Sequence, residues 1–477
     1  MTAPASTSAP ASTPAPASDV AASPGPRRLA RTDLVVLLSA VGAIALLVWL
    51  GFGLTFFADE WSVIAERDLS LAALFQPFNE HWLTVSIIAY RAELAVFGMH
   101  SYVPYLTVLA MLHALVALLV YALVRRRTLR PVAVGIALIV LVFGSGFENL
   151  FWGLQIDFVG ATAMGLGALL LLDDVPTLPG RRRATAAAGL LVIAVMTSGY
   201  GLFMLGLVGL DVLLDKRRRR FVVPLLVPAV LYGAWYLTLG RSGLATHGEP
   251  MTLQRALSLP AFIYQGFATA FGSALGVGDV LGGVVAVAVV GWCVGLAARR
   301  RPVPTRALAC LLAIAAEYVI VGFVRVQLGV WAATYTRYAY LSGILALIAL
   351  ASLIGRPAIP RRATMWAVAA GASVLAVSLV WNVHLLVSGR DLYMQRADMT
   401  RALVTAGLRR PLPAETDPAR SLILVPSPDE LERVTATYGD ARTDSLVPWA
   451  VPPIPPDVQA EADKRVRFGA PVPTEAP

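Results

Sequence analysis

Two polar stretches in the apolar first part of the sequence carry residue types that can do acid–base chemistry. Asp59 and Glu60 follow the first long apolar run directly, and Glu80, His81 and Trp82 form a second polar group further along. A carboxylate at a membrane surface is partly desolvated and can act as a general base. The alternative for the acidic pair is a solvated helix cap or a topology marker. Glu80, His81 and Trp82 are expected to bind a polar acceptor, and the alternative for this group is a helix cap.

Glu148 and Gln155 form a third candidate group, because they flank the aromatic pair Phe151–Trp152. Aromatic rings in such a position suit stacking on a sugar, and they equally suit anchoring at the membrane interface. We therefore expect Glu148 and Gln155 to contact a substrate in the first case and to belong to an interface belt in the second.

Arg337 and Tyr338 lie in a tyrosine-rich segment at the start of a late apolar run. The arginine falls on the side of the membrane opposite to the other basic clusters, so we expect it to have a partner. A lipid phosphate is one candidate, since the planar guanidinium matches phosphate oxygens. An internal salt bridge with Glu317 or with the Asp59–Glu60 pair is the alternative.

Other polar residues are expected to be structural. Asp173–Asp174 resembles a metal-binding acidic pair, but it precedes a basic link and is interpreted as a solvated loop. His113 and Glu317 fall within apolar runs, where a proton relay and internal hydrogen bonding are both open. The two cysteines, Cys293 and Cys310, are expected to be small core residues.

The sequence contains no P-loop, dinucleotide-binding, HExxH or GxSxG motif. It also lacks an acidic triplet of the DxD type. We therefore expect no metal site and no cofactor. A divalent cation stays open as an alternative, although no motif in the sequence indicates one.

The composition places these residues in a membrane protein. Hydrophobic residues make up 57% of the 477 residues and charged residues 14%, whereas soluble domains are nearer half apolar and a quarter charged. Several apolar runs reach the roughly twenty residues that cross a bilayer. No cleavage site follows the first run, so we expect a membrane helix there rather than a signal peptide.

The net charge of +9 reflects basic clusters between the apolar runs rather than a nucleic-acid surface. More than half of the 39 lysines and arginines fall in short links, a pattern typical of the cytoplasmic side of a membrane protein. These links are 27–31, 125–130, 181–183, 216–220, 299–306 and 356–362. Their placement predicts a multi-pass cell-membrane protein with a cytoplasmic N-terminus and an extracytoplasmic C-terminus.

The same placement predicts an all-α polytopic protein with about eleven transmembrane helices. The run 184–214 is bracketed by basic clusters, so it crosses an even number of times, with a turn at 197–201, although two crossings there are short. The expected spans are 34–57, 102–124, 131–147, 154–172, two within 184–214, 221–239, 280–296, 307–324, 338–354 and 363–387.

This layout predicts that the chain has three parts. Residues 1–26 consist almost entirely of Ala, Pro, Ser and Thr and are expected to be a disordered cytoplasmic tail. Residues 27–387 form the transmembrane domain. Residues 388–477 form an extracytoplasmic C-terminal tail, with a helix at 391–408, a short strand at 421–425 and extended chain elsewhere.

Two external segments interrupt the transmembrane domain. The first external loop, 58–101, contains the run 83–97, which is too short to span and carries charges, so we expect interfacial helices there. The second, 240–278, contains a stretch with Phe and Tyr that is expected to lie on the membrane.

This layout resembles that of the GT-C glycosyltransferases, integral membrane enzymes that transfer a sugar from a polyprenyl-phosphate carrier. The likeness covers 34–387, and it is closest to the arabinosyl- and mannosyl-transferase-like branch. The large soluble domain and the WWD signature of the oligosaccharyltransferase branch are absent from the sequence. The matching stretches are FADEW at 57–61, FNEHW at 78–82, MLHAL at 111–115 and RYAY at 337–340.

The resemblance implies roles for three residues. Asp59 matches the catalytic acidic residue of the first external loop, with Glu60 beside it, and Arg337 is similar to arginines that hold the donor phosphate. A polyprenyl phosphate leaves as a stable anion, so one base and one cation suffice, whereas a glycoside hydrolase needs a second carboxyl group. We therefore expect transfer with inversion to an extracytoplasmic glycan, lipid or protein.

Two other classes of protein stay open at this point. A lipid-linked sugar flippase or transporter often has inverted repeats with broken helices, and the glycine-interrupted run 184–214 is compatible with one. A non-catalytic membrane partner in envelope assembly is the other class. In each case the expected partners are membrane lipids and a polyprenyl-linked sugar or envelope component, with no nucleic acid.

Overall fold

The computed structural model describes residues 31–79, 81–173, 180–244, 252–356, 361–409, 426 and 428–468. Across these residues the protein is helical, and the β-type pairing found there is an isolated bridge between Phe78 and His81. The predicted tail at 1–26 and the predicted strand at 421–425 lie outside the described residues.

Eight helical segments of the described chain are long and apolar enough to cross a membrane. Each overlaps a predicted span, so an all-α polytopic membrane protein is confirmed. The helices in these segments are α1 (Arg31–Leu50), α5 (Val103–Val124), α8 (Ile156–Leu171), α11 (Val222–Trp235), α14 (Gly278–Ala298), α15 (Thr305–Arg325), α16 (Thr336–Ile354) and α17 (Arg361–Arg409).

The other predicted spans correspond to shorter helices: α6 (Arg130–Leu141), α9 (Arg181–Thr197) and α10 (Tyr200–Leu214). The break between α9 and α10 falls within the turn predicted at 197–201. The remaining helices are α2 (Asp59–Glu66), α3 (Leu71–Phe75), α4 (Thr84–Phe97), α7 (Glu148–Phe151), α12 (Arg241–Leu244), α13 (Leu253–Leu275), α18 (Pro428–Tyr438) and α19 (Pro456–Phe468).

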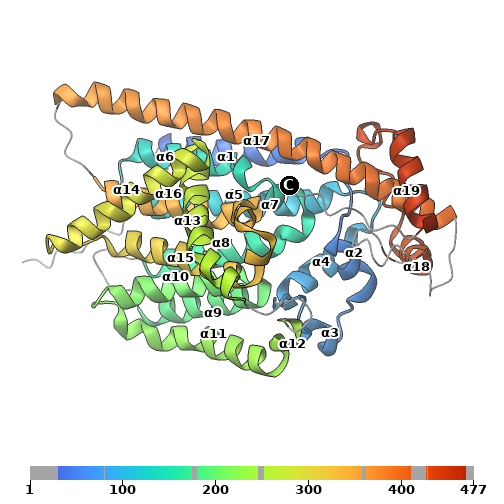
Figure 1. Cartoon of the computed structure of the whole chain (residues 1–477), viewed down its shortest axis with the longest axis horizontal. Coiled ribbons are helices and arrows are strands. Elements are labelled where there is room, and N and C mark those ends of the chain that lie inside the picture. The colour runs from blue at the N-terminus through green and yellow to red at the C-terminus, as the bar shows by residue number, and fades with distance from the viewer. Residues whose placement is uncertain are drawn as a thin grey trace, which may run out of the picture.

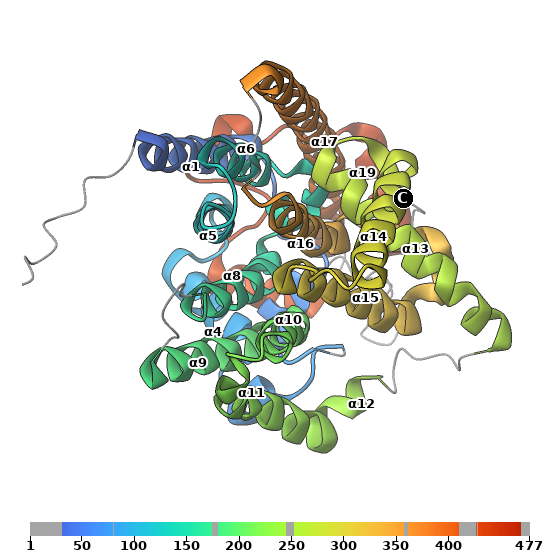
Figure 2. The same cartoon turned by 90° about the vertical axis from the view of Figure 1, so that its left-hand side faces the viewer.

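Most long helices run roughly parallel in a bundle (Figure 1) and are seen nearly end-on in Figure 2. Helix α16 is buried along most of its length and packs against α5, α13 and α15. Helices α2–α4, α18 and α19 gather at one end of the bundle (Figure 1), which we call the loop end. The opposite end carries the basic links after α5, α10 and α14, and we call it the arginine end.

Helix α13 differs from the expectation of a stretch that simply lies on the membrane. It runs at a steep angle to the bundle (Figure 1) and packs against α14, α15 and α16. Thr252 caps its start by accepting a hydrogen bond from the Arg255 backbone N–H at 3.3 Å, and Gly276 ends it in the left-handed conformation. Its buried face, centred on 266–274, is rich in small residues that allow this close packing.

Helix α17 joins two predicted elements into one. The span expected at 363–387 and the helix expected at 391–408 form a single helix of 49 residues. At 1.5 Å per residue it is roughly 74 Å long, more than twice the hydrocarbon thickness of a bilayer. Its second half therefore extends beyond the other long helices at the loop end, where α18 and α19 pack on it (Figure 1).

The C-terminal segment is folded onto the first loop. The expectation of extended chain is wrong for 428–438 and 456–468, which are helical. The Thr55 hydroxyl donates to the Ala441 carbonyl at 2.6 Å, and the Ser445 N–H donates to the His100 carbonyl at 2.7 Å. These bonds fix the loop that carries Asp59.

A group of buried ion pairs, which we call the arginine cluster, joins the helices at the arginine end. Arg306 binds Asp211 at 2.7 Å and Asp173 at 3.2 Å, and Arg218 binds Asp211 at 3.1 Å. Arg127 also pairs with Asp173. The interpretation of Asp173 as part of a solvated loop is wrong, because this residue is fully buried. Its neighbour Asp174 lies outside the described residues.

Buried polar groups inside the bundle behave in two ways. His113 shares a hydrogen bond of 2.9 Å with the Tyr340 hydroxyl, which confirms internal hydrogen bonding for this residue. Glu317 is fully buried, and neither carboxyl oxygen has a hydrogen-bond partner in the described part of the chain. Cys293 and Cys310 are free and buried, as expected of small core residues.

Candidate functional site

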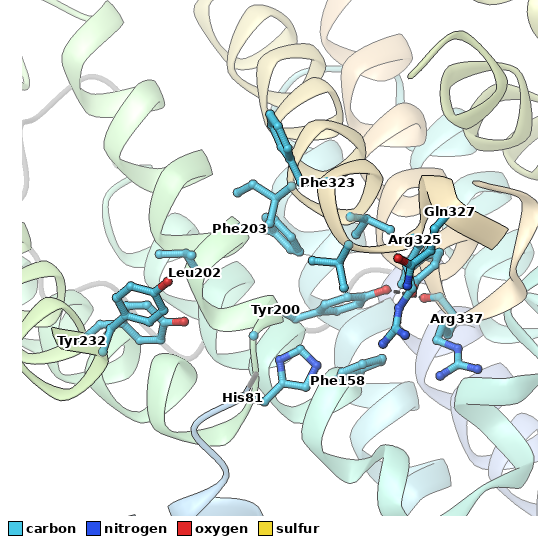
Figure 3. Close-up of a pocket in the computed structure, with 16 residues that line it drawn as sticks. His81, Phe158, Tyr200, Leu202, Phe203, Tyr232, Phe323, Arg325, Gln327 and Arg337 are labelled. Atoms are coloured by element: carbon cyan, nitrogen blue, oxygen red, sulfur yellow. Dashed lines mark hydrogen bonds between the residues drawn. The ribbon is translucent and has the colours of Figure 1, made fainter. Parts of the chain in front are cut away.

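A cleft lies between α11 and α15, and α10, which packs against both helices, forms its floor. Its volume is about 550 Å³. Figure 3 shows that its side chains come from several helices and from the loop before α4. The residues that line this α11–α15 cleft are His81, Phe158, Gly199, Tyr200, Leu202, Phe203, Tyr232, Tyr236, Ile320, Val321, Phe323, Val324, Arg325, Gln327, Arg337 and Tyr338.

The walls of the α11–α15 cleft are apolar and aromatic. Tyr232 lines it from α11 and Tyr236 from the π-helical turn that follows, while Ile320 and Phe323 line it from α15. Ile320 is 44% exposed and Phe323 is 57% exposed, so the cleft is open along its α15 side. Since α11 and α15 both belong to candidate membrane spans, this wall can receive an apolar chain directly from the lipid.

The lining becomes polar where α15 ends and α16 begins. Arg325 is the last residue of α15, and Arg337 lies in the first turn of α16. Figure 3 shows both arginines and His81 gathered around the stacked rings of Phe158 and Tyr200. No carboxylate lines the cleft among the described residues, so this end of the cleft favours an anion.

Arg337 is held in place by Glu148 from α7. Its Nη2 lies 2.9 Å from the Glu148 Oε1, and the Thr336 hydroxyl donates to the Glu148 Oε2 at 3.2 Å. The Tyr200 hydroxyl binds the Arg337 carbonyl. Arg337 therefore has the internal salt bridge that was one of its two alternatives, but with Glu148 instead of Glu317 or the Asp59–Glu60 pair.

Arg337 nevertheless keeps capacity for a ligand. Its Nε is buried and has no hydrogen-bond partner within the described residues, and its side chain is 32% exposed. The guanidinium lies 5.4 Å from the ring of Tyr335, which fixes its plane. A fixed guanidinium with a free N–H at the end of a cleft is suited to an anionic oxygen.

Asp59 is the first residue of α2 and is half-buried. It interacts electrostatically with Arg337 and with Asp157, so it lies close to the polar end of the cleft. The preceding residue, Ala58, has φ 50°, a backbone conformation that is costly for any residue with a Cβ. The structure thus holds Asp59 in position at some conformational cost.

Glu60 faces away from the cleft, into the protein. Its carboxyl group accepts hydrogen bonds from the Tyr90 hydroxyl at 3.0 Å, the Tyr102 hydroxyl at 2.9 Å and the Phe57 N–H at 2.6 Å. Complete burial raises the pKa of Glu60 to about 8, although the surrounding donors act in the opposite direction. Of the predicted catalytic pair, the geometry favours Asp59 over Glu60.

The second polar group divides between two surfaces. The His81 ring lies in the cleft, edge-on to Phe158, and a Cβ at position 199 would overlap it, so the glycine there is needed for this approach. Trp82 instead stacks on Trp235 of α11 with ring centroids 5.1 Å apart. Trp82 therefore anchors the loop to α11, and Glu80 lies outside the described residues.

The third predicted group is also divided. Glu148 holds Arg337, whereas Gln155 is buried and accepts a hydrogen bond from the Asn149 amide at 2.9 Å. Tyr338, predicted beside Arg337, lines the cleft and interacts with Arg325. The structure thus brings His81, Arg337 and Tyr338 into the cleft, with Glu148 behind Arg337.

Sequence reasoning missed three residues at this site. Arg325 follows a late apolar run and Tyr200 falls within the turn predicted at 197–201, and neither position by itself indicates a ligand site. Asp157 was overlooked, although a carboxylate at the start of an apolar helix is a signal for function. In the structure Asp157 is buried in the first turn of α8, where its Oδ1 accepts from the Phe158 N–H at 2.6 Å.

The described residues contain no group of three or more His, Cys, Asp or Glu side chains arranged to hold a metal ion. The polar groups gathered near this end of the cleft are the half-buried carboxylate of Asp59, the buried carboxylate of Asp157, two guanidinium groups and an imidazole. Comparison of the chain with models of known protein families, with curated proteins and with solved structures finds no match.

Proposed function

We propose that this protein is a membrane glycosyltransferase of the GT-C type, which moves a sugar from a polyprenyl-phosphate donor to an extracytoplasmic glycan, lipid or protein. The observation that carries the proposal is the α11–α15 cleft. It is apolar between two candidate membrane spans and ends at Arg325 and Arg337, and Arg337 interacts electrostatically with Asp59.

Each part of such a donor matches one part of the cleft. The prenyl chain suits the apolar walls formed by Tyr232, Ile320 and Phe323. The phosphate suits Arg325 and Arg337, because a guanidinium fork binds phosphate oxygens in its own plane. The sugar would then lie beyond the phosphate, towards the loop end and Asp59.

The proposed reaction needs one base and one cationic site. Asp59 takes the proton of the acceptor hydroxyl, and the oxygen attacks the anomeric carbon from the face opposite to the phosphate. The bond between the anomeric carbon and the phosphate oxygen breaks, and the phosphate keeps the electron pair. Arg325 and Arg337 stabilise that growing charge. A single displacement inverts the anomeric centre.

The proposal includes a membrane topology. About eleven spans, with the arginine end in the cytoplasm, would place the loop end, the polar end of the cleft and the C-terminus outside. A reporter that is active only outside the cytoplasm should work when fused after Pro477 and fail when inserted at Arg220. An active reporter at Arg220 and an inactive one after Pro477 would place Asp59 in the cytoplasm and contradict the proposal.

A lipid-linked sugar flippase is the second candidate, because an apolar cleft with a cationic end also suits translocation of a lipid phosphate. Purified protein in lipid nanodiscs with a radiolabelled polyprenyl-phosphate sugar separates enzyme activity from lipid binding alone. Release or transfer of labelled sugar supports the enzyme. Movement of intact donor across the bilayer of proteoliposomes, without cleavage, supports the flippase.

A pair of variants on one helix tests the cleft itself. Ile320 lines the cleft and is 44% exposed, while Leu312, on the same helix, does not line it and is 40% exposed. Ile320→Trp should reduce donor use about tenfold by filling the cleft, and Leu312→Trp should leave it unchanged. Equal activities for the two variants would show that the donor binds elsewhere.

A further inference from the structure

A second, smaller pocket lies on the opposite face of α16 from the cleft. Its volume is about 120 Å³, and it is enclosed by α13, α14, α16 and α17 with two short turns. Its lining is dominated by hydroxyl groups. The residues are Ser145, Thr269, Gly272, Ser273, Gly278, Asp279, Thr334, Thr336, Ala339, Trp381 and Leu385.

The first turn of α16 separates the two pockets. Thr336 and Ala339, three residues apart on one face of the helix, line the small pocket, whereas Arg337 and Tyr338 line the α11–α15 cleft. Glu148 connects the two sides, because its Oε1 binds Arg337 and its Oε2 binds Thr336. A ligand in the small pocket would therefore lie within one helix turn of the Arg337 side chain.

The small pocket presents hydrogen-bond acceptors. The hydroxyl groups of Ser145, Thr334 and Thr336 each donate their proton to a protein oxygen, on Asn382, Trp331 and Glu148 respectively, which leaves their own lone pairs available. The carboxylate of Asp279 adds further acceptors. A ligand that fits this lining must supply several donors of its own.

The charge and the walls of the pocket narrow the ligand class. Asp279, the one carboxylate that lines the pocket among the described residues, receives the Gln265 amide at 2.8 Å and interacts with Thr269. Both partners are neutral, so an ionised Asp279 keeps its charge and repels an anion. Trp381 and Leu385 form an apolar wall, which a metal ion does not use but the C–H face of a sugar ring does.

We infer that this pocket binds a neutral polyol, such as one end of a sugar ring. Its volume corresponds to about four water molecules at roughly 30 Å³ each, enough for a few hydroxyl groups, and the remainder of the ring would rest against Trp381. Under the proposed function, on which this step rests, the pocket would hold a sugar unit of the acceptor glycan away from the reacting hydroxyl, because the first turn of α16 separates the pocket from the donor cleft.

Direct binding tests the pocket without any donor. The probes are methyl α-D-mannopyranoside and methyl α-D-arabinofuranoside, added in millimolar amounts to the purified full-length protein in nanodiscs. Saturation-transfer NMR reports their binding. We expect binding of at least one probe, weakened about tenfold in Thr269→Val, as for the loss of one hydrogen bond near 1.4 kcal/mol.

Matched variants show whether the glycoside binds in the small pocket. Trp381→Ala should weaken binding about as strongly, while Trp366→Ala, on the same helix, 72% exposed and outside the pocket, should not. Ile320→Trp, which fills the donor cleft, should leave glycoside binding intact. Circular dichroism and thermal unfolding confirm that each variant is folded.

Each outcome bears on one idea at a time. Absence of binding in the wild type, equal loss in Trp366→Ala, or displacement of the probes by sodium ions or ethylamine would overturn the polyol pocket. Glycoside binding without any sugar transfer from the labelled donor would keep the pocket and remove the proposed glycosyltransferase. Binding lost in Ile320→Trp but kept in Trp381→Ala would place the sugar in the cleft instead.

Discussion

The two ends of α15 carry arginines in opposite circumstances. Arg306 and Arg325 lie at the arginine end and the loop end, roughly 28 Å apart along the helix, which is close to the hydrocarbon thickness of a bilayer. Arg306 lies in the arginine cluster, where arginines bind all four carboxylate oxygens of Asp173 and Asp211. Arg325 lies beside a cleft of about 550 Å³.

The difference shows which buried charges hold the fold together and which are available to a ligand. In the arginine cluster the carboxylate oxygens are all paired, although Arg306 Nη1 has no partner within the described chain, and no described residue of the cluster lines either pocket. At the loop end, Arg337 is paired on one side only, and its Nε faces no partner within the described chain. Both regions contain an arginine with one unpaired nitrogen, so the cavity beside Arg337 is the feature that separates a binding site from a structural cluster.

The largest effect is expected from breaking the arginine cluster. Arg306→Ala leaves the buried Asp211 carboxylate without the arginine that binds both its oxygens and removes one of the partners of Asp173, so stability should fall by about 3–5 kcal/mol. The measurement is the yield and thermal unfolding of the purified protein. Arg325→Ala, at the other end of α15, is the control and should unfold near the wild-type temperature while donor use falls. Similar unfolding of both variants would contradict the distinction between the two ends.

The next effect concerns Asp59. If it is the general base, Asp59→Asn should reduce transfer on the order of a hundredfold or more at unchanged expression, because the amide cannot take a proton. Initial rates with the labelled donor measure this. Glu60→Gln is the neighbouring control and should retain most of the activity. Normal transfer by Asp59→Asn, with activity lost in Glu60→Gln, would reverse the assignment of the base.

Arg337 should affect donor use more than folding. Arg337→Ala should raise the donor KM about tenfold. Arg337→Lys should recover only part of the lost donor binding, since an ammonium group lacks the planar guanidinium fork. Because Arg337→Ala also leaves Glu148 without its cation, the double variant with Glu148→Gln is the control. It should recover thermal stability without recovering donor use. A normal donor KM in Arg337→Ala would exclude this arginine from the phosphate site.

The remaining effect is a pH dependence of stability. Burial raises the pKa of Glu60 to about 8, from 4.5 for an unperturbed glutamate, and Glu93 shifts in the same direction. The folded protein therefore holds these protons more tightly than the unfolded chain. Their contribution is complete below about pH 4.5 and is lost as the pH rises through about 8. Thermal unfolding between pH 5 and 9 should show this decline.

Glu60→Gln separates the contribution of Glu60 to the pH dependence from that of Glu93. The amide keeps the shape of a protonated glutamate and does not titrate, so the variant should show a flatter decline than the wild type. An unchanged slope would assign the pH dependence to Glu93 or to other groups.

The sequence by itself determined the membrane character of the protein and the order of its long helices. Hydrophobic runs of spanning length leave a chain few structures other than helices in lipid, because every backbone polar group must be paired within its own segment. The same local rules placed the turn between α9 and α10 and the helix over 84–97. These features depend on neighbouring residues and are readable from a single chain.

Only the tertiary structure decided which polar residues act together. Glu148 and Arg337 are far apart in the sequence, and nothing local distinguishes Glu148 from Glu317 as the partner of that arginine. The burial of Asp173 and the hydroxyl pocket around Asp279 likewise depend on helices that meet from distant parts of the chain. Side-chain partners are set by the packing of whole helices, and hydrophobic periodicity carries no information about which helix faces which.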